Sequence, residues 1–447
     1  MAKKNSKAPS QEFVIKTLGP AKIDNPEIRL NGKAGISHLV EDGTMVRVDP
    51  FWPCGEGEPG EPEAFELAGP RPKIYFDPTK LKVAVATCGG MCPGINTLVR
   101  AMVLQLHYIY GVRNVFGIRY GLQGFIPKYG HEIVELTPEM VRFIHGRGGS
   151  FLGMSRGPQP MDEVVDALER LNIGLLFMIG GDGTMRAAQS IHLEVEKRGL
   201  KCGVIGLPKT IDNDVHYCSR TFGFQTAVER ATHAILGAHN EALGVPYGVG
   251  LVKLMGRHSG FVAAHATLAL SEVNFCLIPE VDFELDGRYG LLARLEERLS
   301  TRGHAVVVAA EGAGQKFFDD GEMGRDASGN KKLGNIGEFL KERISGFCMD
   351  ANVPMTLKYI DPSYLIRSVP ANANDRIFSG FLGHNAVHAG MAGKTDMLVS
   401  HWNNQFVHVP IGLATSKRRT VDPRGGLWQA VLESTGQQAL FANDQIM

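Results

Sequence analysis

Residues 173–198 read IGLLFMIGGDGTMRAAQSIHLEVEKR, and this stretch decides the fold. It opens with a short apolar run, IGLLFMI, of the kind that is buried as a strand. GGDGT at 180–184 is a glycine-rich turn, and the Ala- and Ile-containing segment after it has the composition of a helix. The stretch therefore predicts a strand, a tight turn and a helix over 185–198.

The same order of elements recurs on both sides of this stretch. Residues 82–87 (KVAVAT) predict a strand, and the glycine-rich segment CGGMCPG follows at 88–94. Helical spacing comes next, with Asn96 as the expected N-cap and Gly111 as the expected stop. The alternation of strands and helices continues with strands at 202–207 and 304–310 and with a helix marked by Phe224, Val228, Ala231 and Ile235.

Strands that alternate with helices predict an α/β fold whose parallel-rich sheets are covered by helices on both faces. Ligand-binding loops then lie outside the carboxyl ends of the strands, where each glycine-rich segment falls. The remaining segments are expected to be irregular. They are a polar tail at 1–10, an acidic Pro/Gly-rich linker at 54–72, and a surface loop at 321–334.

Composition excludes several classes of protein. Glycine makes up 54 of 447 residues, about 12% against an average of roughly 7%. The 47 Lys and Arg balance 47 Asp and Glu, which argues against electrostatic binding of nucleic acid. Seven scattered cysteines, a polar N-terminus and no run of 18 apolar residues predict a cytoplasmic protein without membrane contact.

Familiar nucleotide and metal motifs are missing. The glycines at 89, 90 and 94 do not fit GxGxxG, and AGMAGKT at 389–395 has His388 where a Walker A motif needs glycine. Dehydrogenase and P-loop functions therefore lose support. The fifteen histidines show no paired metal spacing, so no structural zinc site is expected.

The glycine turns themselves suit a polyphosphate. Residues 88–94 lead into a helix, so exposed amides there could hold a phosphate. Asp182 lies inside GGDGT, where a carboxylate beside such amides could hold Mg²⁺ against phosphate oxygens. A tight turn with Asp182 as a helix cap is the structural alternative.

The segment PKTIDND at 208–214 carries groups for phosphoryl transfer. Asp212 or Asp214 could accept the proton of an attacking hydroxyl, and Lys209 could neutralise phosphate oxygens. An Asx-type turn on an exposed loop is the alternative.

Basic residues elsewhere could bind an anionic sugar, because arginine forks match phosphate oxygens. These residues are Arg147, Arg156, Arg257, Lys358 and Arg367. Each alone is more often a surface ion-pair residue. KRR at 417–419 is expected on a solvated face.

Six motifs together resemble the 6-phosphofructokinases in order and spacing. They are GGMCPGIN, RGGSFLGMSRG, GGDGT, PKTIDND, VKLMGR and AAEG, and the resemblance runs from about Tyr75 to Gly436. Flanking segments at 75–78, 358–367 and 421–428 are similar to the longer plant and trypanosomatid group rather than to the short bacterial type.

The resemblance implies two Rossmann-like three-layer αβα domains with an N-terminal extension at 1–80. The implied ATP-binding domain is 81–223 with 366–415, and the implied fructose 6-phosphate-binding domain is 224–365 with 416–447. It implies phosphoryl transfer from ATP, with Mg²⁺, to the 1-hydroxyl of fructose 6-phosphate. A homotetramer is the usual state in the family, with a homodimer as the alternative, and no motif here fixes an allosteric effector.

The resemblance also implies residue roles. Asp212 is the implied base, Asp214 lies beside it, Lys209 and Arg257 complete the catalytic set, and Asp182 is the implied magnesium ligand. The residues implied to contact nucleotide phosphates are Gly90, Arg147, Gly181, Asp182, Gly183 and Thr184. Those implied to bind the sugar phosphate are Thr210, Asp212, Met255, Gly256, Arg257, Glu311, Lys358, Tyr364 and Arg367.

Two departures from the family pattern bear on function. Where the short bacterial enzymes have a histidine and two cross-subunit arginines, this chain has Tyr364, Lys358 and Gly248, which argues against that clamp. Pyrophosphate-dependent relatives usually have GGDD together with the lysine of PKTIDND, whereas this chain pairs Lys209 with Gly183.

The donor prediction rests on steric room. A glycine at 183 leaves the path of a nucleotide open, and this predicts ATP. The alternatives are a pyrophosphate-dependent enzyme and a catalytically inactive nucleotide-binding regulatory subunit. NAD kinases and lipid kinases share GGDGT but lack PKTIDND.

Overall fold

The computed structural model describes residues 11–26, 38–51, 63–318, 324 and 332–439. The tail predicted at 1–10, the first part of the linker at 54–72 and most of the loop at 321–334 lie outside these residues. The chain forms two compact units. The first contains Met1–Thr210, Val215–Gly223 and Pro370–Lys417, and the second contains Ile211–Asp214, Phe224–Val369 and Arg418–Met447.

The first unit is built on a mixed sheet of nine strands within the described residues. Its centre is parallel, in the order β16 (Met397–Trp402), β10 (Gly203–Pro208), β9 (Leu175–Gly180), β6 (Lys82–Thr87) and β7 (Asn114–Ile118). Antiparallel strands close both sides. These are β8 (Ile133–Glu135) next to β7, and β17 (Gln405–Pro410), β4 (Ala64–Leu67) and β3 (Met45–Arg47) beyond β16.

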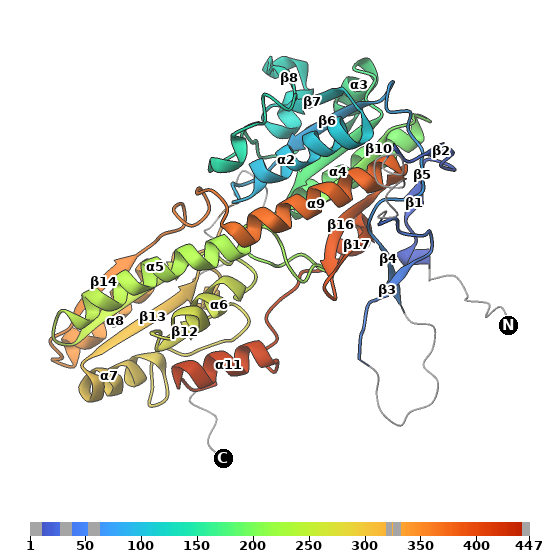
Figure 1. Cartoon of the computed structure of the whole chain (residues 1–447). Coiled ribbons are helices and arrows are strands. Elements are labelled where there is room, and N and C mark those ends of the chain that lie inside the picture. The colour runs from blue at the N-terminus through green and yellow to red at the C-terminus, as the bar shows by residue number, and fades with distance from the viewer. Residues whose placement is uncertain (1–10, 27–37, 52–62, 319–323, 325–331, 440–447) are drawn as a thin grey trace, which may run out of the picture. The chain divides into compact units, whose positions relative to one another are not determined.

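Helices cover both faces of this sheet, as the sequence pattern predicts (Figure 1). α2 (Ile95–Leu104) packs with α9 (Ala373–Met391) on one face, and α3 (Met161–Arg170), α4 (Asp182–Lys197) and α10 (Ile411–Ala414) lie on the other. α2 continues into a π-helical turn, Gln105–Tyr110, that ends at the predicted stop Gly111 with φ 78.

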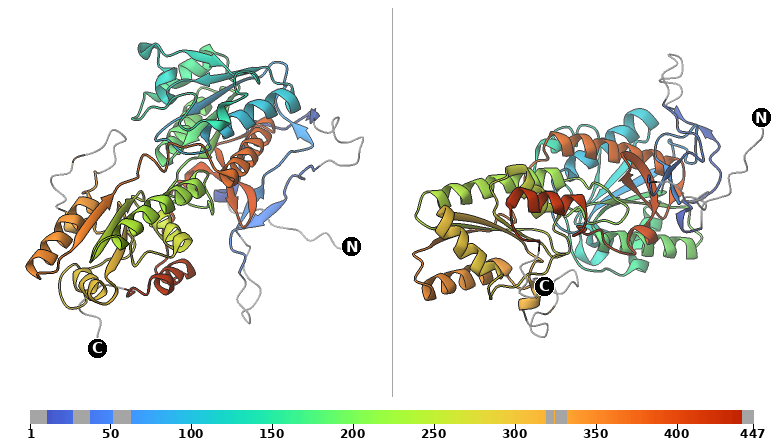
Figure 2. Two further views of the ribbon diagram at one scale, coloured as in Figure 1. Left: turned by 60° about the vertical axis from the view of Figure 1, so that its left-hand side comes forward. Right: turned by 90° about the horizontal axis from the view of Figure 1, so that it is seen from below.

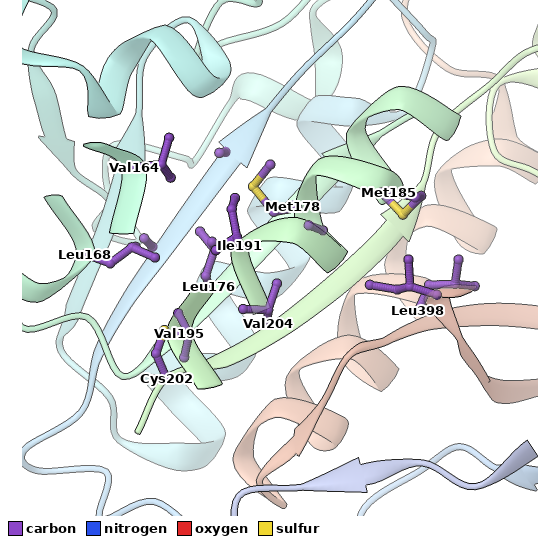
Figure 3. Close-up of a cluster of buried hydrophobic side chains, with 14 of the residues drawn as sticks. Val164, Leu168, Leu176, Met178, Met185, Ile191, Val195, Cys202, Val204 and Leu398 are labelled. Atoms are coloured by element: carbon purple, nitrogen blue, oxygen red, sulfur yellow. The ribbon is translucent and has the colours of Figure 1, made fainter. Parts of the chain in front are cut away.

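The core of the first unit lies between the central strands and α3 and α4. Figure 3 shows Leu176 and Met178 of β9 beside Ile191 and Val195 of α4. All four are almost completely removed from solvent, and burying a side chain of this size stabilises a fold by about 1.5–3 kcal/mol. These side chains therefore hold the central strands against α4.

The N-terminal residues are part of the first unit. β1 (Lys16–Thr17) pairs with β15 (Lys394–Thr395), β2 (Ile23–Asp24) pairs with β5 (Lys73–Ile74), and β3 and β4 extend the main sheet. The linker prediction was wrong at 64–67, which forms β4. Phe65 there is fully buried, and its short apolar run was obscured by flanking proline and glycine.

The second unit has a smaller, all-parallel sheet in the order β12 (Phe275–Leu277), β13 (His304–Ala310), β11 (Gly248–Leu254) and β14 (Thr356–Ile360). α5 (Phe224–Leu243) and α6 (Phe261–Leu270) pack on one face, and α7 (Leu291–Arg302) and α8 (Ile336–Asp350) on the other; Figure 2 gives two further views. α11 (Gly426–Thr435) packs against α6 and β12.

Both units thus have the three-layer αβα arrangement that the sequence predicts. In the described part of the chain, no helix is long and apolar enough to cross a membrane.

Candidate active site

Three glycine or polar segments meet at one edge of the first unit's sheet. β10, β9 and β6 are neighbouring parallel strands, so their carboxyl ends place Lys209, Gly181 and Cys88 at the same edge. Backbone hydrogen bonds join the segments: the Cys88 amide donates to the Ile179 carbonyl at 2.9 Å, and the Lys209 amide donates to the Gly180 carbonyl at 2.8 Å.

Lys209 holds the glycine loop at 88–94. Its side chain is only 5% exposed, and its Nζ donates to the carbonyl of Gly90. Gly94, with φ 104, is the N-cap of α2, and a Cβ there would lie 2.6 Å from the Ser379 hydroxyl. The loop is therefore shaped by its backbone and by one buried cation.

Asn96 is not the N-cap that the sequence predicts, because α2 already begins at Ile95. Its buried side chain instead bridges to a neighbouring loop. The Asn96 Nδ2 donates to the carbonyl of Arg147 at 3.1 Å, and its Oδ1 accepts from the amide of Phe151 at 2.8 Å. The exposed side chain of Arg147 thus projects from a backbone that Asn96 fixes.

GGDGT turns directly into a helix. α4 begins at Asp182 and not at the predicted residue 185, with Gly181 as the N-cap. A carboxylate in the first turn is stabilised by the helix dipole, whose free amides also attract anions. A Cβ on Gly180 would lie 2.2 Å from the Thr184 hydroxyl, whereas one on Gly183 would meet nothing within 4 Å.

A second set of predicted residues gathers at the carboxyl edge of the second unit's sheet. Met255, Gly256 and Arg257 follow β11, and Glu311 follows the adjacent β13. The Glu311 amide donates to the Leu254 carbonyl at 2.8 Å, which joins the two strand ends. Arg367 comes from the segment after the neighbouring strand β14.

The Asp212 carboxyl is held in a charged environment within this unit. Burial, with the nearby carboxylates of Asp214 and Glu311, raises the pKa of Asp212 to about 8, and the guanidinium groups of Arg418 and Arg367 oppose this rise. The backbone is also fixed, since the Ser259 hydroxyl donates to the Asp212 carbonyl at 3.1 Å.

Asp214 has a different role in the same segment. It is 3% exposed, and its Oδ2 accepts a 2.7 Å hydrogen bond from the Nη1 of Arg418 in an ion pair. The Arg419 amide also donates to the Asp214 carbonyl at 2.9 Å. Asp214 is thus tied to an arginine, whereas burial and neighbouring carboxylates favour the neutral form of Asp212.

Glu311 lies among the basic residues. Burial raises the pKa of Glu311, and the charges of Lys253, Arg257 and Arg367 counteract part of that rise. Lys253 in turn pairs with Asp361 at 2.7 Å. The second unit therefore brings Asp212, Asp214, Arg257, Glu311 and Arg367 into one electrostatic group.

Three other predicted residues have exposed side chains. Lys358 is an exposed residue within β14, opposite Gly250 in the register, and not at the end of the strand. Tyr364 is 74% exposed, although the Arg367 guanidinium lies 5.2 Å from the centre of its ring. Arg156 is also exposed.

Arg418 is the member of this charged group that sequence reasoning missed. KRR at 417–419 was expected on a solvated face, but Arg418 pairs with Asp214 and the Arg419 guanidinium lies 4.5 Å from the centre of the Phe261 ring. Lys417 is exposed as expected, but the expectation was wrong for Arg418, because its partner carboxylate is 204 positions earlier. No local spacing signals such a pairing.

Gly248 has a packing role. A Cβ at this position would lie 2.1 Å from the carbonyl oxygen of Ala242, because α5 ends and turns directly into β11 here. The close approach leaves no room for any side chain, which explains physically why an arginine is absent.

Comparisons with known proteins agree with the family that the six motifs indicate. A family model described as "Phosphofructokinase" matches residues 82–390, more than half of the chain. The chain belongs to the phosphofructokinase family. A Borreliella burgdorferi relative named "ATP-dependent 6-phosphofructokinase" is 47% identical over 97% of this chain and 98% of its own length. A relative of the same name from Amycolatopsis methanolica is 48% identical over 96% of this chain and 95% of its own.

The family extends to parasites, and its fold is known from solved structures. A Trypanosoma cruzi relative, also named "ATP-dependent 6-phosphofructokinase", is 46% identical over 83% of this chain and 76% of its own. A pyrophosphate-dependent phosphofructokinase from Marinobacter aquaeolei matches with a TM-score of 0.65 at 19% identity, covering 79% of this chain and 91% of that one. At this identity the likeness concerns the phosphofructokinase fold.

Proposed function

We propose that this protein transfers the terminal phosphoryl group of ATP to the 1-hydroxyl of fructose 6-phosphate, giving fructose 1,6-bisphosphate in glycolysis. The observation that carries the proposal is the Asp212 carboxyl, whose pKa is raised to about 8 beside the Asp214–Arg418 pair. Family membership and the names of relatives that share nearly half of the sequence support the substrates.

Asp212 is the proposed base. A carboxyl with a pKa close to the working pH can take the hydroxyl proton as the oxygen attacks and is strong enough as a base to do so. An unshifted carboxylate would be a much weaker base. Asp214, paired with Arg418, keeps the segment in place, and Lys209 and Arg257 are proposed to offset charge on the transferring group.

The first unit is proposed to bind the nucleotide and the second the sugar phosphate. Backbone amides at Gly90, Gly181, Gly183 and Thr184, with Arg147, would contact the polyphosphate. For the sugar phosphate we propose Thr210, Met255, Gly256, Arg257, Glu311, Lys358, Tyr364 and Arg367. Arginine suits both tasks, since its fork matches phosphate oxygens.

A magnesium ion fits this site through Asp182. The described residues contain no group of three or more His, Cys, Asp or Glu side chains that could hold a metal alone. Mg²⁺ is commonly held by one or two carboxylates together with substrate phosphates, and a single acid at a helix N-terminus matches that donor set. When bound, Mg²⁺ would neutralise charge on the phosphate oxygens.

The donor is proposed to be ATP because the space around Gly183 is open. Lys209 does not favour pyrophosphate by itself, since it already bonds the Gly90 carbonyl within the loop. The test is a coupled assay for fructose 1,6-bisphosphate with ATP and pyrophosphate side by side. We expect turnover with ATP; turnover with pyrophosphate alone would contradict the donor, and none with either would contradict the function.

A cytoplasmic location and a homotetramer, with a homodimer as the alternative, complete the proposal. Light scattering of the purified protein, with and without fructose 6-phosphate, tests the oligomeric state.

A further inference from the structure

The segment Val215–Gly223 follows the two carboxylates in the chain and belongs to the first unit. It forms no helix, and Tyr217 within it has a left-handed backbone with φ 55. A large side chain remains in that conformation only where its surroundings fix it. The hydroxyl of Ser400 donates to the Tyr217 carbonyl at 2.5 Å, and the amide of Ser219 donates to the His401 carbonyl at 2.8 Å.

The rings of Phe13, Phe65 and Trp402 surround the Tyr217 side chain, and these three rings together with that of Tyr217 are here called the aromatic clamp. The Tyr217 ring centre lies 5.0 Å from Phe65, 6.4 Å from Phe13 and 5.7 Å from Trp402, each with edge-on geometry. Phe13 and Phe65 also contact each other at 5.4 Å. Edge-to-face contact at these distances is favourable.

Two of the four rings come from the N-terminal residues, which lie outside the matched family region at 82–390. Phe13 is 3% exposed, and Phe65 is fully buried. The N-terminal part also reaches Trp402, whose Nε1 donates to the Val48 carbonyl at 2.7 Å. Phe13 and Phe65, which contact Tyr217, therefore come from a part of the chain that supplies no strand-end loop to the candidate site.

We propose that Phe13 and Phe65 are positioning residues for the catalytic segment, acting through Tyr217. Tyr217 lies three positions after Asp214, a span of about 10 Å in extended chain, so a change in the backbone at Tyr217 is covalently close to the carboxylates. The inference rests on the proposed function, because it assigns these rings a role in phosphoryl transfer.

The test uses the full-length protein with Phe13→Ala. Phe13 lies in a short 3-10 turn, Gln11–Phe13, so its truncation removes no strand of the main sheet. Val14→Ala is the matched control, since Val14 is adjacent but 50% exposed. Phe13→Leu tests rescue by an apolar side chain of similar size.

For Phe13→Ala we expect kcat to fall at least tenfold while the KM for ATP changes less than twofold. We also expect faster hydrogen exchange of the amides at 211–219, and an apparent pKa for kcat/KM below that of the wild type, because Asp212 becomes better solvated. Val14→Ala should match the wild type, and Phe13→Leu should recover most of kcat.

The proposal is overturned if folded Phe13→Ala keeps wild-type exchange at 211–219, or if it keeps wild-type kcat and pH profile. Exchange needs no activity, so if the wild type transfers no phosphoryl group, the proposed function fails while the clamp is judged on exchange alone. If Phe13→Ala does not fold, Tyr217→Asn decides by the same measurements. Asparagine tolerates the left-handed backbone but removes the ring.

Discussion

The strand ends of the two units differ in the groups that they present. In the first unit the edge consists of glycine turns and helix-start amides, with Gly183 and Arg147 exposed. In the second unit the edge is a group of charged side chains, within which burial and nearby charges raise the pKa of Asp212 and of Glu311. Binding by backbone amides requires open space around them, whereas the electrostatics of a charged group depend on each side chain in it. Single substitutions should therefore have different effects at the two edges.

The largest expected effect comes from the second unit. Asp212→Asn should lower kcat by about 10²–10⁴-fold, because it removes the proposed base, while fructose 6-phosphate still binds. Steady-state kinetics and calorimetric titration measure the two quantities. Asp286→Asn is the control, since Asp286 pairs with Arg343 at an exposed position. Near-normal turnover in Asp212→Asn would remove this residue from the role of base.

The next effect concerns space in the first unit. Gly183→Asp should lower kcat/KM for ATP by about 10²-fold, through bulk and charge in the nucleotide path. Thermal stability should stay the same or rise slightly, because nothing lies within 4 Å of the added Cβ and the first helical turn favours an acid. Gly183→Ala serves as control and should keep most activity. Equal ATP kinetics in Gly183→Asp would show that position 183 does not select the donor.

The pH dependence of the free energy of unfolding should reflect the raised pKa of Asp212. Its folded-state pKa of about 8 exceeds the ordinary carboxyl value near 4, so the native state binds more protons than the unfolded state between these values. The free energy of unfolding should therefore decrease as pH rises from about 4 to 8, by up to about 5 kcal/mol. Urea unfolding across this range should show a flatter profile for Asp212→Asn. Parallel profiles for both proteins would contradict the raised pKa.

The smallest effect compares one substitution at both edges. Arg418→Lys keeps the charge but loses the guanidinium geometry of a part-buried pair, and should lower the free energy of unfolding by about 1–2 kcal/mol. Arg147→Lys, at an exposed position, should change it by less than about 0.5 kcal/mol. Chemical denaturation measures both. Equal losses would mean that the two edges do not differ in this way.

The sequence predicted the features that depend on neighbouring residues. Strand, glycine turn and helix at 173–198 are local, and so is the αL stop at Gly111. Contacts between residues that are far apart in the sequence could not be predicted from local patterns. Arg418 with Asp214 and Phe65 with Tyr217 depend on how distant segments pack, and neither position carries a motif.

Asn96 illustrates a second limit of prediction from the sequence. Its residue type favours an N-cap, but α2 begins one residue earlier at Ile95, after the left-handed Gly94. The side chain instead bonds to a loop that lies 51 and 55 positions further along, at Arg147 and Phe151. Propensity predicted the right element and the wrong partner, because tertiary contacts decided which hydrogen bonds the amide makes.

The division of the chain into interleaved segments has a practical consequence. The polypeptide passes from one unit to the other after Thr210, Asp214, Gly223, Val369 and Lys417. No single cut in the backbone yields two fragments that each hold a complete unit, so a gene split at any one point cannot express either unit on its own. A single proteolytic nick should likewise leave two fragments associated until the fold itself is lost, and the halves of this protein are open to study only within the whole chain.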